Sequence, residues 1–254
     1  MGFNYPWATR EIGFSGDCKR GDKLPSVRPV QEWLTLQGFG VTVDGDFGPA
    51  TERAVKAFQG KNSVAANGVV DLATHGLLTA PMLRVLAPLA AAPGLGQMMV
   101  AYAEQHLTEH PCEVGGQNRG PWVRLYMEGN EGKEWAWCAG FACFIMRQSA
   151  DTLNVPLPVK STFSCDELAS RARSVGLFLS GLHLTDPQQQ LTPGSIFLNR
   201  KTTTDWTHTG LVTAVHEETF DTIEGNTNDA GDREGYEVCR RVRSYDSKDF
   251  ILIR

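Results

Sequence analysis

Residues 134–141 read EWAWCAGF, and the second half of the chain can be interpreted around the cysteine of this segment, Cys138. Small and apolar residues follow it, with Phe141, Phe144 and Ile145 at three- and four-residue spacing. This spacing predicts a helix packed into a core, with Cys138 in its first turn. Unpaired backbone N–H groups and the positive end of the helix dipole favour a thiolate there, the reactive form of cysteine. The alternative is a buried structural cysteine, the commoner fate of a free thiol.

A predicted β-hairpin further along the chain carries groups that could activate this thiol. Its strands are residues 206–215 and 220–226. Because strand side chains alternate between faces, Glu224 and Asn226 share a side. With a tight turn between the strands, His208 lies opposite Asn226 and diagonal to Glu224. A thiol, an imidazole and an orienting carboxylate or amide make a nucleophile, a base and its orienting group, so we predict catalytic roles for these residues and Cys138.

Four segments of the second half follow one another as a set of motifs. They are residues 137–141, 193–197, 208–212 and 223–228. Together they resemble the successive signatures of the CHAP family, papain-like cysteine amidases and peptidases that cut peptidoglycan. The resemblance covers roughly residues 98–254 and implies a nucleophile helix packed on a curved antiparallel sheet. It places both Glu224 and Asn226 near His208; we favour Glu224, because a carboxylate also stabilises the charged imidazole.

Helix and strand patterns in this half agree with that layout. Predicted helices are residues 98–110, 122–127, the segment after Cys138, and 163–175; predicted strands are 195–199, 208–215, 220–224, 236–243 and 249–253. Helices first and an antiparallel sheet after them indicate an α+β domain.

Two further groups of side chains have competing interpretations. Trp137 and Trp206 flank the catalytic candidates and could form walls of a substrate groove, although simple packing explains them equally well. His106, His110 and Cys112 could bind a metal ion, but they lack a second ligand cluster or an HExxH motif. We therefore predict that these side chains lie on the solvated face of a helix and bind no metal ion, and we expect no cofactor.

The pattern of turns and helix starts in residues 23–80 predicts a small three-helix domain. A tight turn at Asp44-Gly45 precedes Pro49, which is well placed to begin a helix, and the turn pattern recurs at Asn67-Gly68. This segment resembles the peptidoglycan-binding type 1 domain, most strongly over residues 43–59, which implies wall binding. The alternative is a helical unit that extends the fold or binds another protein.

The remaining segments are predicted from composition. Residues 1–22 are expected to form an extended N-terminal segment. Residues 81–97, rich in Ala, Pro and Gly, are expected to be a linker, because prolines block a continuous helix. The uncharged stretch after Arg84 has the length of a membrane span, but its prolines and glycines favour a linker over insertion. A catalytic domain of residues 98–254 follows.

Bulk composition narrows the partners and the compartment. The 254 residues carry a formal net charge of -5, which argues against a generic nucleic-acid-binding protein and gives no bulk attraction to an anionic membrane. Six cysteines without a CxxC pair indicate reduced thiols. The first residues lack a basic stretch followed by an apolar one, so we expect synthesis in the cytoplasm without a signal peptide. The site of action would be the periplasm or cell wall, after release or injection.

Two classes of function remain. The first is a cysteine hydrolase that cuts an amide of peptidoglycan, as an N-acetylmuramoyl-L-alanine amidase or a stem-peptide endopeptidase. Such an enzyme would serve as a phage lysin or as an injected antibacterial toxin, and a toxin would require a cognate immunity protein. The second is a non-catalytic wall-binding or structural component that retains the hydrolase fold.

Overall fold

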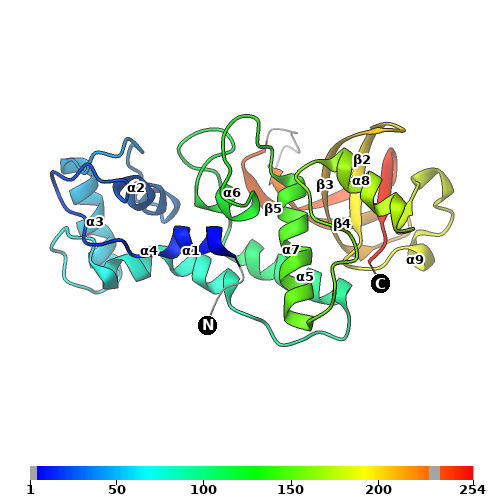
Figure 1. Ribbon diagram of the computed structural model, residues 1–254, viewed down its shortest axis with the longest axis horizontal. Coiled ribbons are helices and arrows are strands. Elements are labelled where there is room, and N and C mark those ends of the chain that lie inside the picture. Colours follow the sequence, from blue (N-terminus) through cyan, green and yellow to red (C-terminus); the bar gives the residue numbers. More distant parts are fainter. Residues whose placement is uncertain (1–4, 229–234, 254) are drawn as a thin grey trace. The chain divides into compact units, whose positions relative to one another are not determined.

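The computed structural model describes residues 5–228 and 235–253, and the chain forms two compact units (Figure 1). The first unit is Met1–Ala87 with Cys112–Lys133, and the second is Pro88–Pro111 with Glu134–Arg254. The chain therefore returns to the first unit for one segment after entering the second. This division differs from the expected one, in which a single domain ran on from residue 98.

Helices dominate the first unit. They are α1 Pro6–Ile12, α2 Val27–Leu36, α3 Pro49–Lys61, α4 Leu72–Leu86 and α6 Pro121–Tyr126. Helices α2 to α4 confirm the predicted three-helix domain. The prediction of an extended N-terminal segment is wrong for α1, where Pro6 occupies the first turn and Ala8 and Glu11 are buried.

Two loops of the three-helix domain are each closed around a buried glutamine. Gln31 Nε2 donates to Asp44 Oδ1 at 2.8 Å and to Thr51 Oγ1 at 3.2 Å. The Gly45 N–H donates to Gln31 Oε1 at 2.8 Å. Gln59 repeats this set of contacts in the second loop. Its partners are Asn67 Oδ1, Thr74 Oγ1 and the Gly68 N–H. The internal repeat seen in the sequence is therefore a repeat of hydrogen bonding.

Helix α4 runs through Pro81, where the sequence predicted a linker. Proline lacks the N–H that would bond to the carbonyl of Leu77 in a regular helix. Gln37 Nε2 donates to that carbonyl at 3.3 Å and to the carbonyl of Leu78 at 3.1 Å. A side chain thus replaces the lost backbone bond, and only residues 87–94 lie outside a helix before the next one begins.

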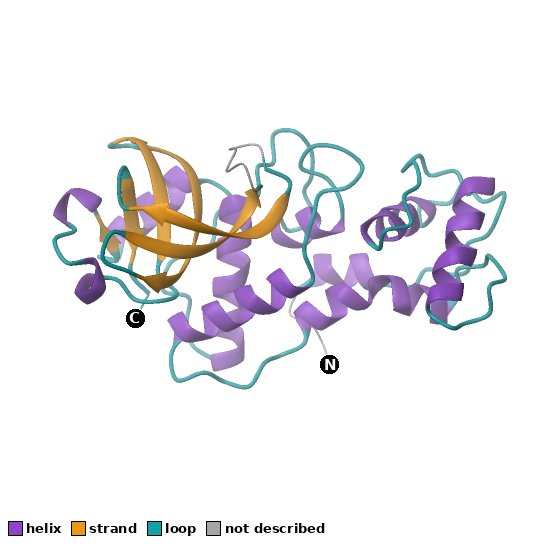
Figure 2. Ribbon diagram, turned by 180° about the vertical axis from the view of Figure 1, so that it is seen from behind, coloured by secondary structure: helices purple, strands orange, loops and turns teal. Residues whose placement is uncertain are grey.

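The second unit combines helices with one sheet (Figure 2). Its helical segments are α5 Leu95–Thr108, α7 Cys138–Leu153, α8 Cys165–Ser174, the short 3-10 helix η1 Gly181–His183, and α9 Pro187–Gln190. Its strands are β1 Phe178–Leu179, β2 Ile196–Thr202, β3 Asp205–Val215, β4 Thr219–Thr227, β5 Glu237–Ser244 and β6 Lys248–Ile251. In the described residues these six strands pair antiparallel in the order β1-β6-β2-β3-β4-β5, which confirms the predicted α+β class.

Helix α7 packs against α5 and against strands β3 and β4. Its close approach to β4 depends on Gly225. A Cβ atom at this position would lie 2.7 Å from Phe141 Cβ and 2.8 Å from the ring of Trp137, closer than any side chain tolerates. The glycine therefore lets the first turn of α7 settle directly on the strand that carries Glu224.

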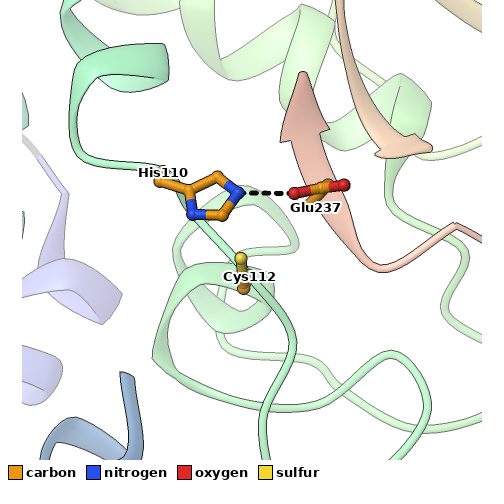
Figure 3. Close-up of side chains that lie close together, drawn as sticks. All are labelled: His110, Cys112 and Glu237. Carbon is orange, nitrogen blue, oxygen red and sulfur yellow. Dashed lines mark hydrogen bonds and ion pairs between the residues drawn. The ribbon is translucent and has the colours of Figure 1, made fainter. Parts of the chain in front are cut away.

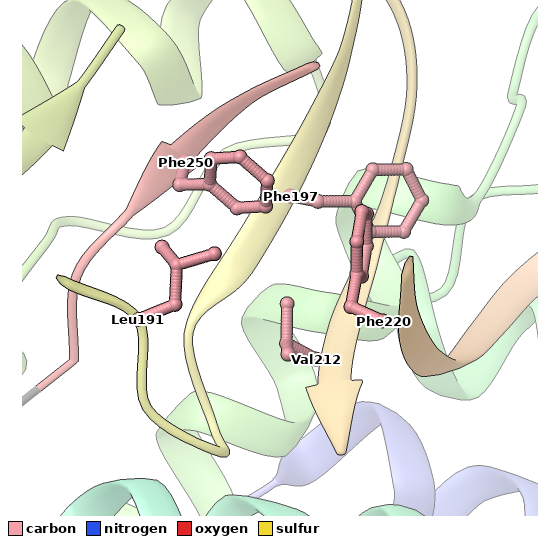
Figure 4. Packing of buried hydrophobic residues seen from close by; sticks show 5 residues of the cluster. All are labelled: Leu191, Phe197, Val212, Phe220 and Phe250. Carbon is pink, nitrogen blue, oxygen red and sulfur yellow. The ribbon is translucent and has the colours of Figure 1, made fainter. Parts of the chain in front are cut away.

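An apolar cluster fills one part of the second unit (Figure 4). Its buried members are Leu191, Phe197, Val212, Phe220 and Phe250. The ring centroid of Phe220 lies 5.6 Å from that of Phe197 and 5.4 Å from that of Phe250, and both distances are typical of aromatic pairs. Phe197 also contacts the ring of His208, with 6.0 Å between centroids. The cluster therefore supports one side of the imidazole.

The uncharged stretch after Arg84 is divided between α4, residues 87–94 and α5. Across residues 5–228 and 235–253, none of the helices combines the length and the apolar character that crossing a membrane requires.

Candidate active site

Cys138 is the first residue of α7, directly after the N-cap residue Trp137, as predicted. Its side chain is buried, with 5% exposed. The first backbone N–H groups of a helix have no partner within it, and together with the helix dipole they favour an anionic sulfur. The Ala139 N–H contributes in this sense, since it lowers the pKa of the Cys138 thiol.

His208 on β3 and Glu224 on β4 meet as the hairpin prediction required. The two strands pair Leu211 with Ile223. His208 Nε2 lies 2.8 Å from Glu224 Oε2, and both side chains are buried. Gly210 makes room for this contact, because a Cβ there would lie 2.6 Å from Glu224 Cγ.

Two residues that the sequence did not single out complete the surroundings of the Glu224 carboxylate. Arg243 donates from Nε to Oε1 at 2.8 Å and from Nη2 to Oε2 at 2.6 Å. Thr222 Oγ1 donates to Oε1 at 2.6 Å. The forked guanidinium fixes the plane of the carboxylate, and this bidentate geometry is the strongest form of such a pair. The carboxylate is therefore held in the orientation that faces His208.

These contacts shift both pKa values toward the charged forms. Burial alone would raise the pKa of Glu224, but hydrogen bonds from Arg243 and His208 lower it to about 2. Burial alone would lower the pKa of His208, but interaction with Cys138 and with Glu224 raises it to about 9. The imidazole is therefore protonated at neutral pH beside an ionised carboxylate.

The thiol of Cys138 is favoured as a thiolate. The Cys165 thiol lies 3.8 Å away, Sγ to Sγ. A hydrogen bond from Cys165 and the charge of His208 hold the pKa of Cys138 well below its ordinary value, although burial acts in the opposite direction. The pKa of Cys165 is raised by the same interaction. His208 Nδ1 is buried and, within the described part of the chain, makes no hydrogen bond of ordinary length and angle; its interaction with Cys138 nevertheless lowers the pKa of the thiol. Because Nε2 faces Glu224, Nδ1 is the nitrogen left for proton exchange with the sulfur.

Asn226 follows Glu224 by two residues on β4. In the described part of the chain, no hydrogen bond joins its side chain to the imidazole of His208, in contrast to Glu224. The side chain of Asn226 is 2% exposed, and its backbone has a positive φ of 55°. Its Oδ1 is buried without a hydrogen-bond partner among residues 5–228 and 235–253. Of the two candidates for the orienting role, the carboxylate of Glu224 makes the contact with His208.

The two tryptophans predicted as groove walls are buried. Trp137 is 0% exposed and Trp206 is 5% exposed. The Trp206 indole N–H donates to Asp249 Oδ2 at 2.8 Å, and the guanidinium of Arg173 lies 4.8 Å from its ring centroid. These contacts favour packing, the alternative that the sequence left open, over contact with a substrate.

The two histidines considered as metal ligands have separate partners. His106 is fully buried, and its Nε2 lies 3.0 Å from Gln148 Oε1. His110 is exposed and hydrogen-bonds to Glu237 on β5 (Figure 3). The predicted solvated helix face is wrong for His106, whose ring packs against Phe141 and Phe144. His110 is solvent-exposed as expected, but it lies after the end of α5 at Thr108 and not on a helix.

Comparison with known proteins identifies one part of the chain. Residues 23–78 match the model of a putative peptidoglycan binding domain. The match covers α2, α3 and the first half of α4 in the first unit, and it supports peptidoglycan as a binding partner. No curated protein matches the chain significantly.

Proposed function

We propose that the chain is a cysteine hydrolase that binds peptidoglycan through its first unit and cuts an amide bond with its second. The observation that carries the catalytic part is the arrangement of His208. Its Nε2 faces an ionised carboxylate that Arg243 holds with two hydrogen bonds, and its buried Nδ1 is left for the Cys138 thiol, whose pKa is lowered by Cys165 and by His208. A nucleophile, a base and an orienting group are thus present together.

The chemistry assigned to these residues is acyl transfer. The Cys138 thiolate attacks the amide carbonyl, and the negative charge that develops on oxygen meets backbone N–H groups at the start of α7. The His208 imidazolium gives its proton to the leaving amine, which leaves a thioester on Cys138. His208, now neutral, takes a proton from water, whose oxygen attacks the thioester and releases the acid. Glu224 keeps its charge throughout and stabilises the imidazolium in both half-reactions.

The match of residues 23–78 supports the cell-wall polymer as the substrate. Two amides of that polymer suit the chemistry: the bond between muramic acid and L-alanine, and a bond within the stem peptide. Identification of the new amino group in the products by mass spectrometry separates the two. A phage lysin or an injected toxin would act on either bond, and a toxin would require an immunity protein.

The test compares two cysteines of the same helix. Cys138→Ala should reduce the release of fragments from purified sacculi by at least about 10³-fold, because the nucleophile is removed. Cys143→Ser is the matched control; Cys143 is buried and burial raises its pKa to about 11, so it is unsuited to nucleophilic attack. Circular dichroism checks that both variants fold. Wild-type activity in Cys138→Ala would disprove the assignment.

The second candidate is a wall-binding protein without catalysis, favoured by the fact that the matched model concerns binding alone. Iodoacetamide separates the two at once, because a catalytic Cys138 should be alkylated well before the other five thiols. Equal labelling of all six would favour the non-catalytic candidate.

A further inference from the structure

The first unit contains a pocket of about 420 Å³, within the range of small-ligand sites and outside the residues assigned to catalysis. Its floor consists of buried apolar side chains: Val30, Trp33, Val70 and Leu78. Three larger side chains line it nearer the surface, Arg10, Phe14 and His75, and the rings of the last two lie 5.5 Å apart.

One wall of the pocket comes from the N-terminal residues 10–18, which precede the matched segment 23–78. This wall is fixed at both ends. Glu11 accepts hydrogen bonds from Arg124 at 2.8 and 2.7 Å, and Cys18 pairs with Val70 through two backbone bonds at 3.1 and 2.8 Å. Because both ends are held, the pocket is formed before any ligand arrives, which lowers the entropy cost of binding.

The charges around the pocket favour an anion at its rim. The carboxylate of Glu11 is compensated by Arg124, and burial, opposed by those hydrogen bonds, raises its pKa. Burial lowers the pKa of His75, so this imidazole is neutral at pH 7. Arg10 is exposed and adds a positive charge at the rim.

We propose that this pocket binds a short peptide with alkyl side chains and a free carboxylate, which in the cell wall is the stem peptide; the inference rests on the proposed wall binding. Methyl groups would lie on the apolar floor, with a carboxylate near Arg10. A sugar fits this pocket poorly, because each hydroxyl group that loses water needs a new hydrogen-bond partner and the floor is apolar. The first unit would thus recognise the peptide rather than the glycan.

The experiment uses the full chain with Cys138→Ala, so that no probe is hydrolysed. Isothermal titration with a synthetic stem tetrapeptide should give saturable binding, and titration with chitotetraose, a glycan without peptide, should not. Arg10→Ala should weaken binding of the peptide by up to about fivefold, which is the upper limit for one exposed charge pair. Pro25→Trp, at an exposed lining position, should block the pocket and abolish binding. Arg53→Ala, an exposed cation on α3 outside the pocket, is the matched control.

The outcomes separate this proposal from the wall binding on which it rests. Peptide affinity unchanged in both Arg10→Ala and Pro25→Trp, or binding of chitotetraose in place of the peptide, would overturn the pocket assignment. Absence of peptide binding by a protein that still pellets with sacculi would overturn it too and leave wall binding standing. A protein that does not pellet with sacculi would refute wall binding itself. Equal melting temperatures of the variants confirm that their folds are intact.

Discussion

Replacing Glu224 with glutamine tests the electrostatic assignment most directly. The substitution keeps the shape of the side chain but removes the negative charge 2.8 Å from His208 Nε2. In the wild type, burial would lower the pKa of His208, and interaction with Cys138 and Glu224 instead raises it from 6.5 to about 9. The imidazolium thus stabilises the fold fully below pH 6.5, and this contribution is lost as the pH rises through about 9.

The size of the effect follows from that difference. An increase of the His208 pKa from 6.5 to about 9 corresponds to roughly 3 kcal/mol in favour of the charged imidazole. Cys138 and Glu224 share this stabilisation, so removing the carboxylate should withdraw on the order of 1.5 kcal/mol, and the pKa of His208 should fall by about one unit. The alkaline limit of hydrolysis should move to lower pH by the same amount, since the proposed mechanism needs the imidazolium as the acid.

NMR titration of the His208 ring measures this pKa without assuming a substrate. The alkaline limit of hydrolysis is measured as the release of fragments from sacculi at a series of pH values. The matched control is Asp221→Asn, which removes a carboxylate 3.2 Å from the exposed imidazole of His216. A surface pair of this kind contributes little, so the control should leave His208 unchanged. If Glu224→Gln folded normally and titrated His208 at the wild-type pH, the reasoning would be refuted.

Three further experiments probe other parts of the site. Gly210→Ala should lower hydrolysis at least about tenfold and the free energy of unfolding by about 1–3 kcal/mol, because its Cβ would collide with Glu224; Gly76→Ala, which has open space around its Cβ, should leave hydrolysis unchanged. Hydrogen peroxide should oxidise the Cys138 thiolate to a sulfenic acid, from which the Cys165 thiol displaces water to form a disulfide. Mass spectrometry should detect this link, dithiothreitol should restore activity, and persistent Cys138 oxidation without a disulfide would contradict it. Treatment with EDTA should leave hydrolysis within about tenfold, because thiolate and imidazole need no ion for this chemistry; a complete loss restored by one metal would contradict this.

Local patterns in the sequence were sufficient to predict helix α7 and the hairpin of β3 and β4. Apolar spacing after Cys138 predicted α7, and strand alternation predicted which side chains β3 and β4 would present together. Both patterns involve neighbouring residues whose geometry depends on the backbone alone. For the same reason both Glu224 and Asn226 could be placed near His208 from the amino-acid sequence, whereas the preference for Glu224 rested on the chemistry of a carboxylate.

Contacts between distant segments could not be predicted in this way. β5 carries Arg240, Arg241 and Arg243, and nothing in their spacing indicates which of them reaches Glu224. The register pairs Glu224 with Cys239, so the long side chain of Arg243 extends along the strand to make the contact. Cys165 likewise comes from another helix, and only the folded chain brings its sulfur next to that of Cys138.

The expected domain boundary had the same weakness. Composition indicated a linker, but the segment of residues 112–133 returns to the first unit through contacts with residues far away in sequence. Arg124 forms ion pairs with Glu11 and Glu32, and Trp122 packs edge to face against Trp33. A chain shortened to begin near residue 96 would lose the partners of both side chains, so the proposed wall binding and hydrolysis are better tested separately by point substitutions than by truncation.

The glutamine-centred loops of the three-helix domain have a consequence for how its surface can evolve. Gln31 and Gln59 hold the loop backbones from inside, so the side chains of Asp44 and Asn67, which also accept hydrogen bonds from these glutamines, are not the sole supports of the loop shape. Exposed loop positions that do not contact the glutamines can then change their chemistry while the loop geometry persists. The backbone shape of these loops can therefore be kept while their surface side chains change, as in binding proteins whose loops are held by a rigid scaffold.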